Sequence, residues 1–422
     1  MLETISNLFK IPDLKKRLIF TIAMIVVVRL GSHIPLPGID KEAMANLFTQ
    51  GGIFSFFDLF AGGALSRFSI FALGIMPYIN ASIIMSLLQS VVPILEQWSK
   101  EGEEGRNKIT NITRYFTVLL AIIQAFGISV WLRSLGVLII SGFPYQILLI
   151  ITLTAGTCFL MWLGEQITDF GIGNGISIII FTGIIASIPS QLIQTIKLLQ
   201  IGEIGIISFI ALLVIFVLVI GGVIAIQQGQ RRIPVQYAKR IVGRRMYGGQ
   251  GTHIPLRVNQ AGVIPIIFAS AILMFPATIG QFFQNINFLK NLSDALSPGK
   301  PLYLVLYTIL IVIFTFFYST ITFNPANLAD NMKKYGGFIP GIRPGINTTN
   351  YIDHIMTRVT LSGAIFLAII AILPNVLIKI TGITTFSFGG TSILIMVGVA
   401  LETIQQIESH LLMRHYEGFI KK

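Results

Sequence analysis

The ionisable and nucleophilic side chains of this 422-residue chain form no pattern that hydrolytic or metal chemistry uses. No histidine belongs to an HExxH motif or has an acidic partner at helical spacing, which argues against a metalloprotease. The five histidines are His33, His253, His354, His410 and His415. A single cysteine, Cys158, excludes an intramolecular disulfide and a cysteine metal cluster. With no phosphate-binding loop either, the sequence predicts a protein that is not an enzyme and binds no cofactor or metal.

Polar residues inside apolar segments are few, and packing explains them best. Three serines on apolar segments are interpreted as helix-packing residues rather than nucleophiles. They are Ser177, Ser270 and Ser392. Arg29 and Glu402 lie near the ends of their segments, where a long side chain can reach the membrane surface, so structural roles are favoured over ion sites. Glu165 and Asp169 are expected at the membrane interface.

The residues with unusual spacing are isoleucines. Six of them recur on four apolar segments, each shortly after a glycine-containing entry at Gly74, 173–175, Gly262 or 389–390. They are Ile75, Ile79, Ile176, Ile180, Ile267 and Ile395. Isoleucine is β-branched and stiff at its first side-chain torsion, so a ring of such residues would form a narrow apolar constriction. A constriction of this kind excludes water and blocks ions.

Two short patterns occur twice, in the same order. GxxPxIxASxI is found at 74–84 and 262–272, and GxSIxI at 175–180 and 390–395. Each pair links a segment of the first half to one of the second half, as an internal duplication predicts.

The composition is that of a polytopic membrane protein, with 54% hydrophobic and only 11% charged residues. Apolar windows predict ten membrane-spanning helices. They lie near residues 18–36, 68–93, 115–132, 145–164, 175–196, 204–226, 262–284, 302–323, 359–379 and 387–407. The apolar piece 56–61 is too short to span, and a break at Gly62-Gly63 follows it. We therefore expect a half-helix that enters the membrane and turns back.

Basic residues set the expected orientation. Most of the 30 fall on the side that holds both termini, which the positive-inside rule makes cytoplasmic. Five helices per half is an odd number, so the two halves, residues 1–200 and 201–422, run in opposite senses. The predicted fold is all-α, with two inverted five-helix halves around a central pore.

Two cytoplasmic loops stand out, at 227–260 and 324–357. The first carries seven basic residues and no acid. Such a loop suits RNA phosphates or an acidic protein surface, and contact with anionic lipid headgroups is an equal alternative. In the second loop, prolines flank Arg343 and hold it in place as a docking point.

Seven long motifs resemble one family, that of bacterial SecY, the central subunit of the Sec protein-conducting channel. They are GSHIPLPGID (31–40), GGALSRFSIFALGIMPYINASII (62–84), MWLGEQITDFGIGNGISIIIF (161–181), GQRRIPVQYAKR (229–240), THIPLRVNQAGVIPIIFAS (252–270), NPANLADNMKKYGGFIPGIRPG (324–345) and FGGTSILI (388–395).

The resemblance implies a role for each matching residue. The six isoleucines match the pore ring, and the half-helix, within about 55–67, matches the plug that closes the external funnel. The plug residues are Phe57, Asp58, Leu59, Phe60, Ala61, Gly62, Gly63, Ala64, Leu65, Ser66 and Arg67. The contacts for SecA and the ribosome are Arg231, Arg232, Lys239, Arg240, Arg244, Arg245 and Arg343. Gln124 is the candidate polar residue of the lateral gate.

The resemblance also implies a function and partners. The chain would translocate unfolded preproteins across the bacterial cytoplasmic (inner) membrane and release hydrophobic segments sideways into its lipids. SecA with ATP or a translating ribosome would supply the energy, signal sequences would open the gate, and SecE and SecG would be the partner subunits.

Two alternatives share parts of this architecture. An inverted-repeat secondary transporter predicts a polar site at the membrane midplane, where this sequence places isoleucines. A ribosome-docking scaffold without a pore would need neither the half-helix nor the glycine-led repeats.

Overall fold

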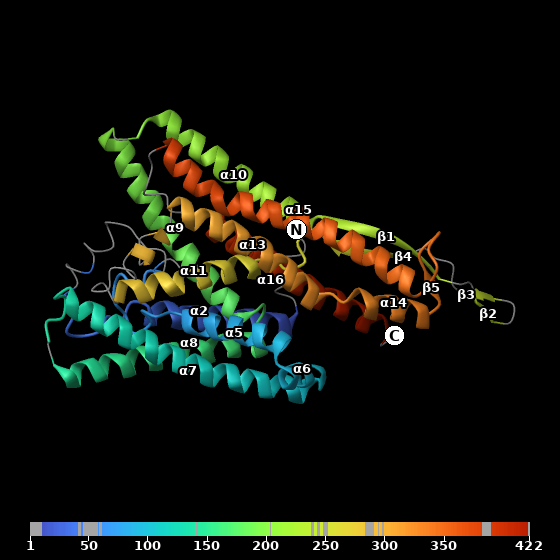
Figure 1. Cartoon of the computed structure of the whole chain (residues 1–422), viewed down its shortest axis with the longest axis horizontal. Helices are drawn as coiled ribbons and strands as arrows, with labels where there is room; N and C mark the ends of the chain where they lie inside the picture. The colour runs from blue at the N-terminus through green and yellow to red at the C-terminus, as the bar shows by residue number, and fades with distance from the viewer. Residues whose placement is uncertain are drawn as a thin grey trace. The chain divides into compact units, whose positions relative to one another are not determined.

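The computed structural model confirms a mainly helical membrane protein (Figure 1). It describes residues 11–40, 44, 58, 61–140, 142–202, 204–237, 240–242, 245–247, 252–282, 291–293, 295–297, 299–381 and 390–420. The chain forms two compact units. The first consists of Met1–Glu203, Ser270–Leu304 and Val399–Lys422, and the second of Ile204–Ala269 and Val305–Gly398.

Of the helices whose bounds the structure gives, six lie wholly in the first unit. They are α2 (Pro12–Gly31), α5 (Met76–Val91), α6 (Pro93–Lys100), α7 (Glu103–Ser134), α8 (Phe143–Phe170) and α9 (Gly175–Ile201). Helices α7 and α8 run side by side (Figure 1). A core of apolar side chains from α7, α8 and the segments before α5 includes Phe68, Trp131 and Leu153, all buried.

The remaining helices complete the second unit or pass through both units. Those of the second unit are α10 (Ile206–Gln228), α14 (Pro325–Lys334), α15 (Ile346–Thr381) and most of α13 (Pro301–Thr322). Helices α11 (Ile264–Phe282) and α16 (Gly390–Ile420) contribute residues to both units. Within the second unit, α10 packs along α15 (Figure 1).

Every one of the ten predicted windows overlaps a helix of the structure. Among the described residues, six helices are long and apolar enough to cross a membrane, or seven if α5 and α6 count as one span bent by 98°. The window 68–93 was wrong at its start, because the helix begins only at Met76. Pro77 stands in the first turn of α5, where a missing backbone N–H costs nothing.

The residues just before α5 form a folded segment instead. Leu36 N donates to Phe68 O at 3.0 Å, and Ile70 N donates to Ile34 O at 3.1 Å, so this segment is fastened to the loop after α2. Phe68 has a φ of 45°, and within the described ranges it is the one residue other than glycine with positive φ. Burial of its ring in the core holds this strained backbone in place.

Short strands in the loops 227–260 and 324–357 were not predicted. They are β1 (Gln230–Tyr237), β2 (Arg240–Val242), β3 (Arg245–Tyr247), β4 (Thr252–Arg257) and β5 (Gly337–Phe338). Strands β4, β1 and β5 form one antiparallel sheet, and β2 pairs with β3.

The three-stranded sheet joins the loops 227–260 and 324–357 into one platform. Ile233 and Val235 alternate with exposed residues along β1 and point into a buried cluster. Met332 of α14 and Ile352 of α15 lie in the same cluster. Figure 1 shows β1 and β4 beside the start of α15. Residues far apart in the sequence therefore present one rigid surface.

Candidate functional site

The candidate pore isoleucines lie at the beginnings of four helices. Helices α5, α9, α11 and α16 start at residues 76, 175, 264 and 390, so every one of the six isoleucines is next to a helix start or within its first two turns. The glycines that precede three of these helices, Gly74, Gly173 and Gly262, have φ values of 57°, 82° and 62°. Other residues rarely adopt this conformation, which explains the glycine-led pattern of the sequence.

Most of these isoleucines are buried. Ile75 and Ile79 share one face of α5 at a spacing of four, as Ile176 and Ile180 do on α9. The buried members are Ile75, Ile79, Ile180 and Ile395, whereas Ile176 and Ile267 are half-buried. Four of the six belong to the first unit and two to the second, and their assembly into one ring stays a prediction.

The candidate plug is organised by an aspartate. The carboxylate Oδ1 of Asp58 accepts hydrogen bonds from the backbone N–H groups of Leu65 at 2.8 Å and Ser66 at 2.9 Å. Burial raises the pKa of the Asp58 carboxyl, and the hydrogen bonds from Ser66 and Leu65 oppose that shift. The predicted plug residues Phe57, Leu59 and Phe60 lie outside the described residues.

The candidate plug lies against the entry to α5. A Cβ added to Gly74 would be 3.4 Å from the Cα of Ala61 in the plug. Gly74 precedes Ile75, so the plug contacts the same helix start that carries two of the candidate pore residues.

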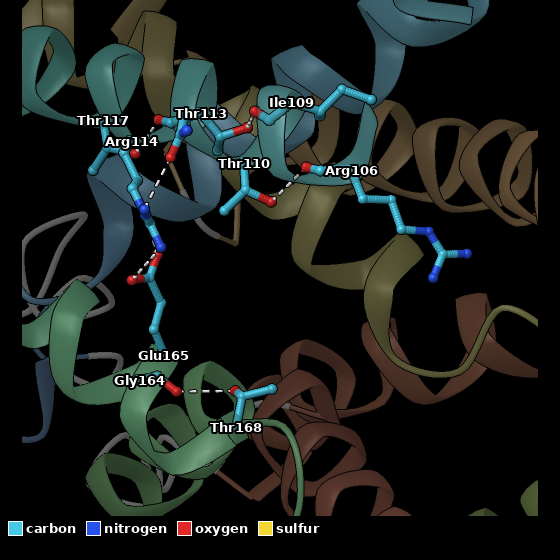
Figure 2. A network of polar contacts seen from close by, with 10 residues as sticks. Arg106, Ile109, Thr110, Thr113, Arg114, Thr117, Gly164, Glu165 and Thr168 are labelled. Carbon is cyan, nitrogen blue, oxygen red and sulfur yellow. Dashed lines mark hydrogen bonds and ion pairs between the residues drawn. The ribbon is translucent and has the colours of Figure 1, made fainter. Parts of the chain in front are cut away.

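An ion pair that sequence reasoning missed joins α7 to α8 (Figure 2). Glu165, expected at the membrane interface, accepts hydrogen bonds from Arg114 Nε at 2.7 Å and Nη2 at 2.9 Å. Arg114 Nη1 also donates to Asn111 Oδ1 at 2.9 Å. The paired geometry is rigid, so it fixes one side of the third predicted span. The two residues are 51 positions apart, and local patterns do not reveal such a partner.

Hydroxyl groups around this ion pair are satisfied by their own helices (Figure 2). Thr113 and Thr117 of α7 donate to carbonyls one turn earlier, at 2.9 and 2.7 Å, and Thr168 of α8 donates to Gly164 at 2.9 Å. These three hydroxyl groups are therefore structural.

The turn between α8 and α9 is tied to two other helices. Arg17 Nη1 of α2 donates to Gly171 O at 3.1 Å, and Thr21 Oγ1 accepts from Ile172 N at 3.0 Å. From α16, Gln406 Oε1 accepts from Gly173 N at 2.5 Å. The start of α9, which carries two candidate pore residues, is therefore held on both sides.

The predicted docking residues fall into three groups. Arg231, Arg232 and Arg343 are exposed on the platform. Arg240 lies in β2 and Arg245 in β3, whose pairing joins Val242 to Arg245. Lys239 and Arg244 lie outside the described residues. Gln124, the candidate gate residue, is half-buried on α7.

The fold matches solved channel structures. One, described as the structure of a protein-conducting channel, gives a TM-score of 0.68 at 20% identity, with 96% of each chain covered. A second is Sec61 in the canine ribosome–channel complex from the endoplasmic reticulum, with a TM-score of 0.64 at 19% identity over 96% of each chain. At these identities the likeness establishes the fold.

The sequence comparison identifies the family. The family model SecY matches residues 69–404. The protein translocase subunit SecY of Streptomyces galbus is 49% identical over 438 aligned residues, which cover 100% of both chains. Because the identity is this high over the full length, and because the family model matches most of the chain, the chain belongs to the SecY family.

Proposed function

We propose that the chain is a passive, gated channel subunit rather than an enzyme. Unfolded preproteins would cross the bacterial cytoplasmic membrane through it, and hydrophobic segments would leave sideways into lipid. The observation that carries this proposal is the start of four helices at glycine-led turns next to isoleucines. The full-length likeness to a protein translocase subunit supports it.

The six isoleucines would act as a flexible seal. A narrow apolar ring hinders the passage of water and ions and would close the idle channel together with the plug, yet its side chains can move apart around a polypeptide. The plug would close the external side while the channel is idle. The lateral gate would lie between the second and third spans, α5 and α7 with Gln124, and the seventh and eighth, α11 and α13.

Partner proteins would supply the energy for translocation and would bind the channel at its basic residues. The exposed arginines of the platform, together with the other basic residues of the loop 227–260, suit the acidic surface of a motor protein or the phosphates of ribosomal RNA. SecA and the ribosome are the partners that the family implies, and the Sec61 relative is described in a ribosome complex. SecE and SecG would complete the channel.

The topology is part of the proposal. Residues 1–200 and 201–422 would form the two inverted halves, and both termini would be cytoplasmic. The excess of basic residues on the loops 227–260 and 324–357 supports this orientation.

Conductance measurements on the purified complex in planar bilayers test the channel. We expect the intact complex to be silent and a variant without residues 57–67 to conduct, because the deletion removes the plug and leaves only the apolar ring. Silence from both, with the partner subunits present, would contradict the proposed function.

A further inference from the structure

Arg29 reaches the plug. It lies in the last turn of α2, and its Nη1 donates a hydrogen bond to the backbone carbonyl of Gly62 at 3.0 Å. The sequence analysis favoured a structural role for Arg29 over an ion site, and a hydrogen bond to the backbone of another segment is such a role. The hydrogen bond joins a spanning helix to a segment that has to move for the channel to open.

The backbone carbonyl of Gly62 is the main partner of the Arg29 guanidinium. Arg29 is half-buried, and within the described part of the chain its guanidinium makes no ion pair. Arg67, at the end of the plug, donates its Nε to the next carbonyl, Gly63 O, at 3.0 Å. Arg67 would move with the plug, whereas Arg29 would stay on α2. Release of the plug therefore breaks the Arg29 bond.

Gly62 is packed so closely that a side chain would not fit at this position. An ideal Cβ on Gly62 would be 2.7 Å from the Cα of Gly183 in α9 and 3.1 Å from Arg29 Nη1. The φ of Gly62 is 65°, a conformation that side chains disfavour. The plug backbone thus lies directly between α2 and α9, and the bond from Arg29 is aligned by this close approach.

A small cavity adjoins the same contact. It has a volume of about 20 Å³, and Arg29, Ala61, Ile75 and Gly183 are among the residues that line it. A space of this size holds about one water molecule. The plug, the arginine and a candidate pore isoleucine therefore border one small space inside the first unit.

We propose that Arg29 is a positioning residue that holds the plug in its closed position through the Gly62 carbonyl. The inference rests on the proposed channel function and adds a specific regulator of the resting state. Arg29 stabilises the closed form and contributes nothing once the plug has left.

Single-channel recording of the purified complex tests this role. We expect Arg29→Met to raise the open probability of the idle channel about tenfold or more, which is the effect of losing a hydrogen bond from a charged donor. Arg29→Lys keeps a cationic donor and should restore part of the closure. Arg133→Met removes an exposed arginine at the end of α7 and should leave the channel silent.

A combined variant separates plug positioning from a general structural role. In a complex that lacks residues 57–67, Arg29→Met should add no further conductance, because its partner is gone. An equal increase with and without the plug would overturn the proposal, as would a silent Arg29→Met complex beside a conducting deletion. If the deletion itself stayed silent, the channel function would fail as well, so the two failures are distinguishable.

Discussion

Replacement of Ile79, Ile180 and Ile267 by glycine should make the idle channel leak ions. Each substitution removes a side chain from the predicted constriction, and a wider, less apolar passage fills with water. We expect the barrier to ion passage to fall by at least about 1.4 kcal/mol. Because each 1.36 kcal/mol corresponds to a factor of about ten in rate, the conductance should rise at least about tenfold. Planar-bilayer recording of the purified complex measures it.

A matched set of substitutions controls for the glycine itself. Ile185, Ile207 and Ile313 are exposed isoleucines on three spanning helices, with exposed fractions of 40%, 84% and 54%. Their replacement by glycine costs a similar amount of helix stability and should leave the channel closed. Equal leak from both triple variants would show that the ring isoleucines have no special role in the seal.

Substitution of Gly156 by alanine should destabilise the first unit. Gly156 lies in α8, and an ideal Cβ there would be only 2.0 Å from the backbone oxygen of Ile70. The hydrogen bond from Ile70 N to Ile34 O anchors the backbone of Ile70. We expect the free energy of unfolding to fall by about 1–3 kcal/mol, as for other overpacked sites. Thermal unfolding of the complex in detergent measures the change.

Gly221 provides the control for this prediction. It also lies inside a helix, α10, but an added Cβ meets nothing within 4 Å. Gly221→Ala should therefore be neutral or stabilising, since alanine favours a helix by about 1 kcal/mol relative to glycine. Equal stability of the two variants would mean that the contact between Gly156 and Ile70 is not tightly packed.

The helices, and the location of the six isoleucines just after glycine-led helix starts, could be predicted from the sequence. Long apolar windows and glycine-led repeats are local patterns, and the structure has a helix for each window and a positive φ at Gly74, Gly173 and Gly262. The late start of α5 was missed, because residues 68–75 are apolar yet are fastened by hydrogen bonds to the loop after α2. Composition does not distinguish a folded apolar segment from a spanning helix.

The contacts between distant residues could not be predicted. The Arg114–Glu165 ion pair and the Arg29–Gly62 hydrogen bond depend on which segments pack together. A single position in the sequence does not show which segment will lie beside it. The three-stranded sheet was missed because its strands are short and come from loops far apart in the sequence. The sequence shows that these loops are basic, but only the folded structure shows that they form one platform.

The most direct test of the channel is contact between a moving polypeptide and the predicted ring. A photo-crosslinking amino acid at Ile79 or Ile395 should react with a preprotein arrested in mid-translocation by a folded domain at its end. The same probe at the exposed Ile207 should not react. Crosslinks at both ring positions, dependent on SecA and ATP, are the result we predict. An arrested, protease-protected preprotein that crosslinks at neither position would contradict the account.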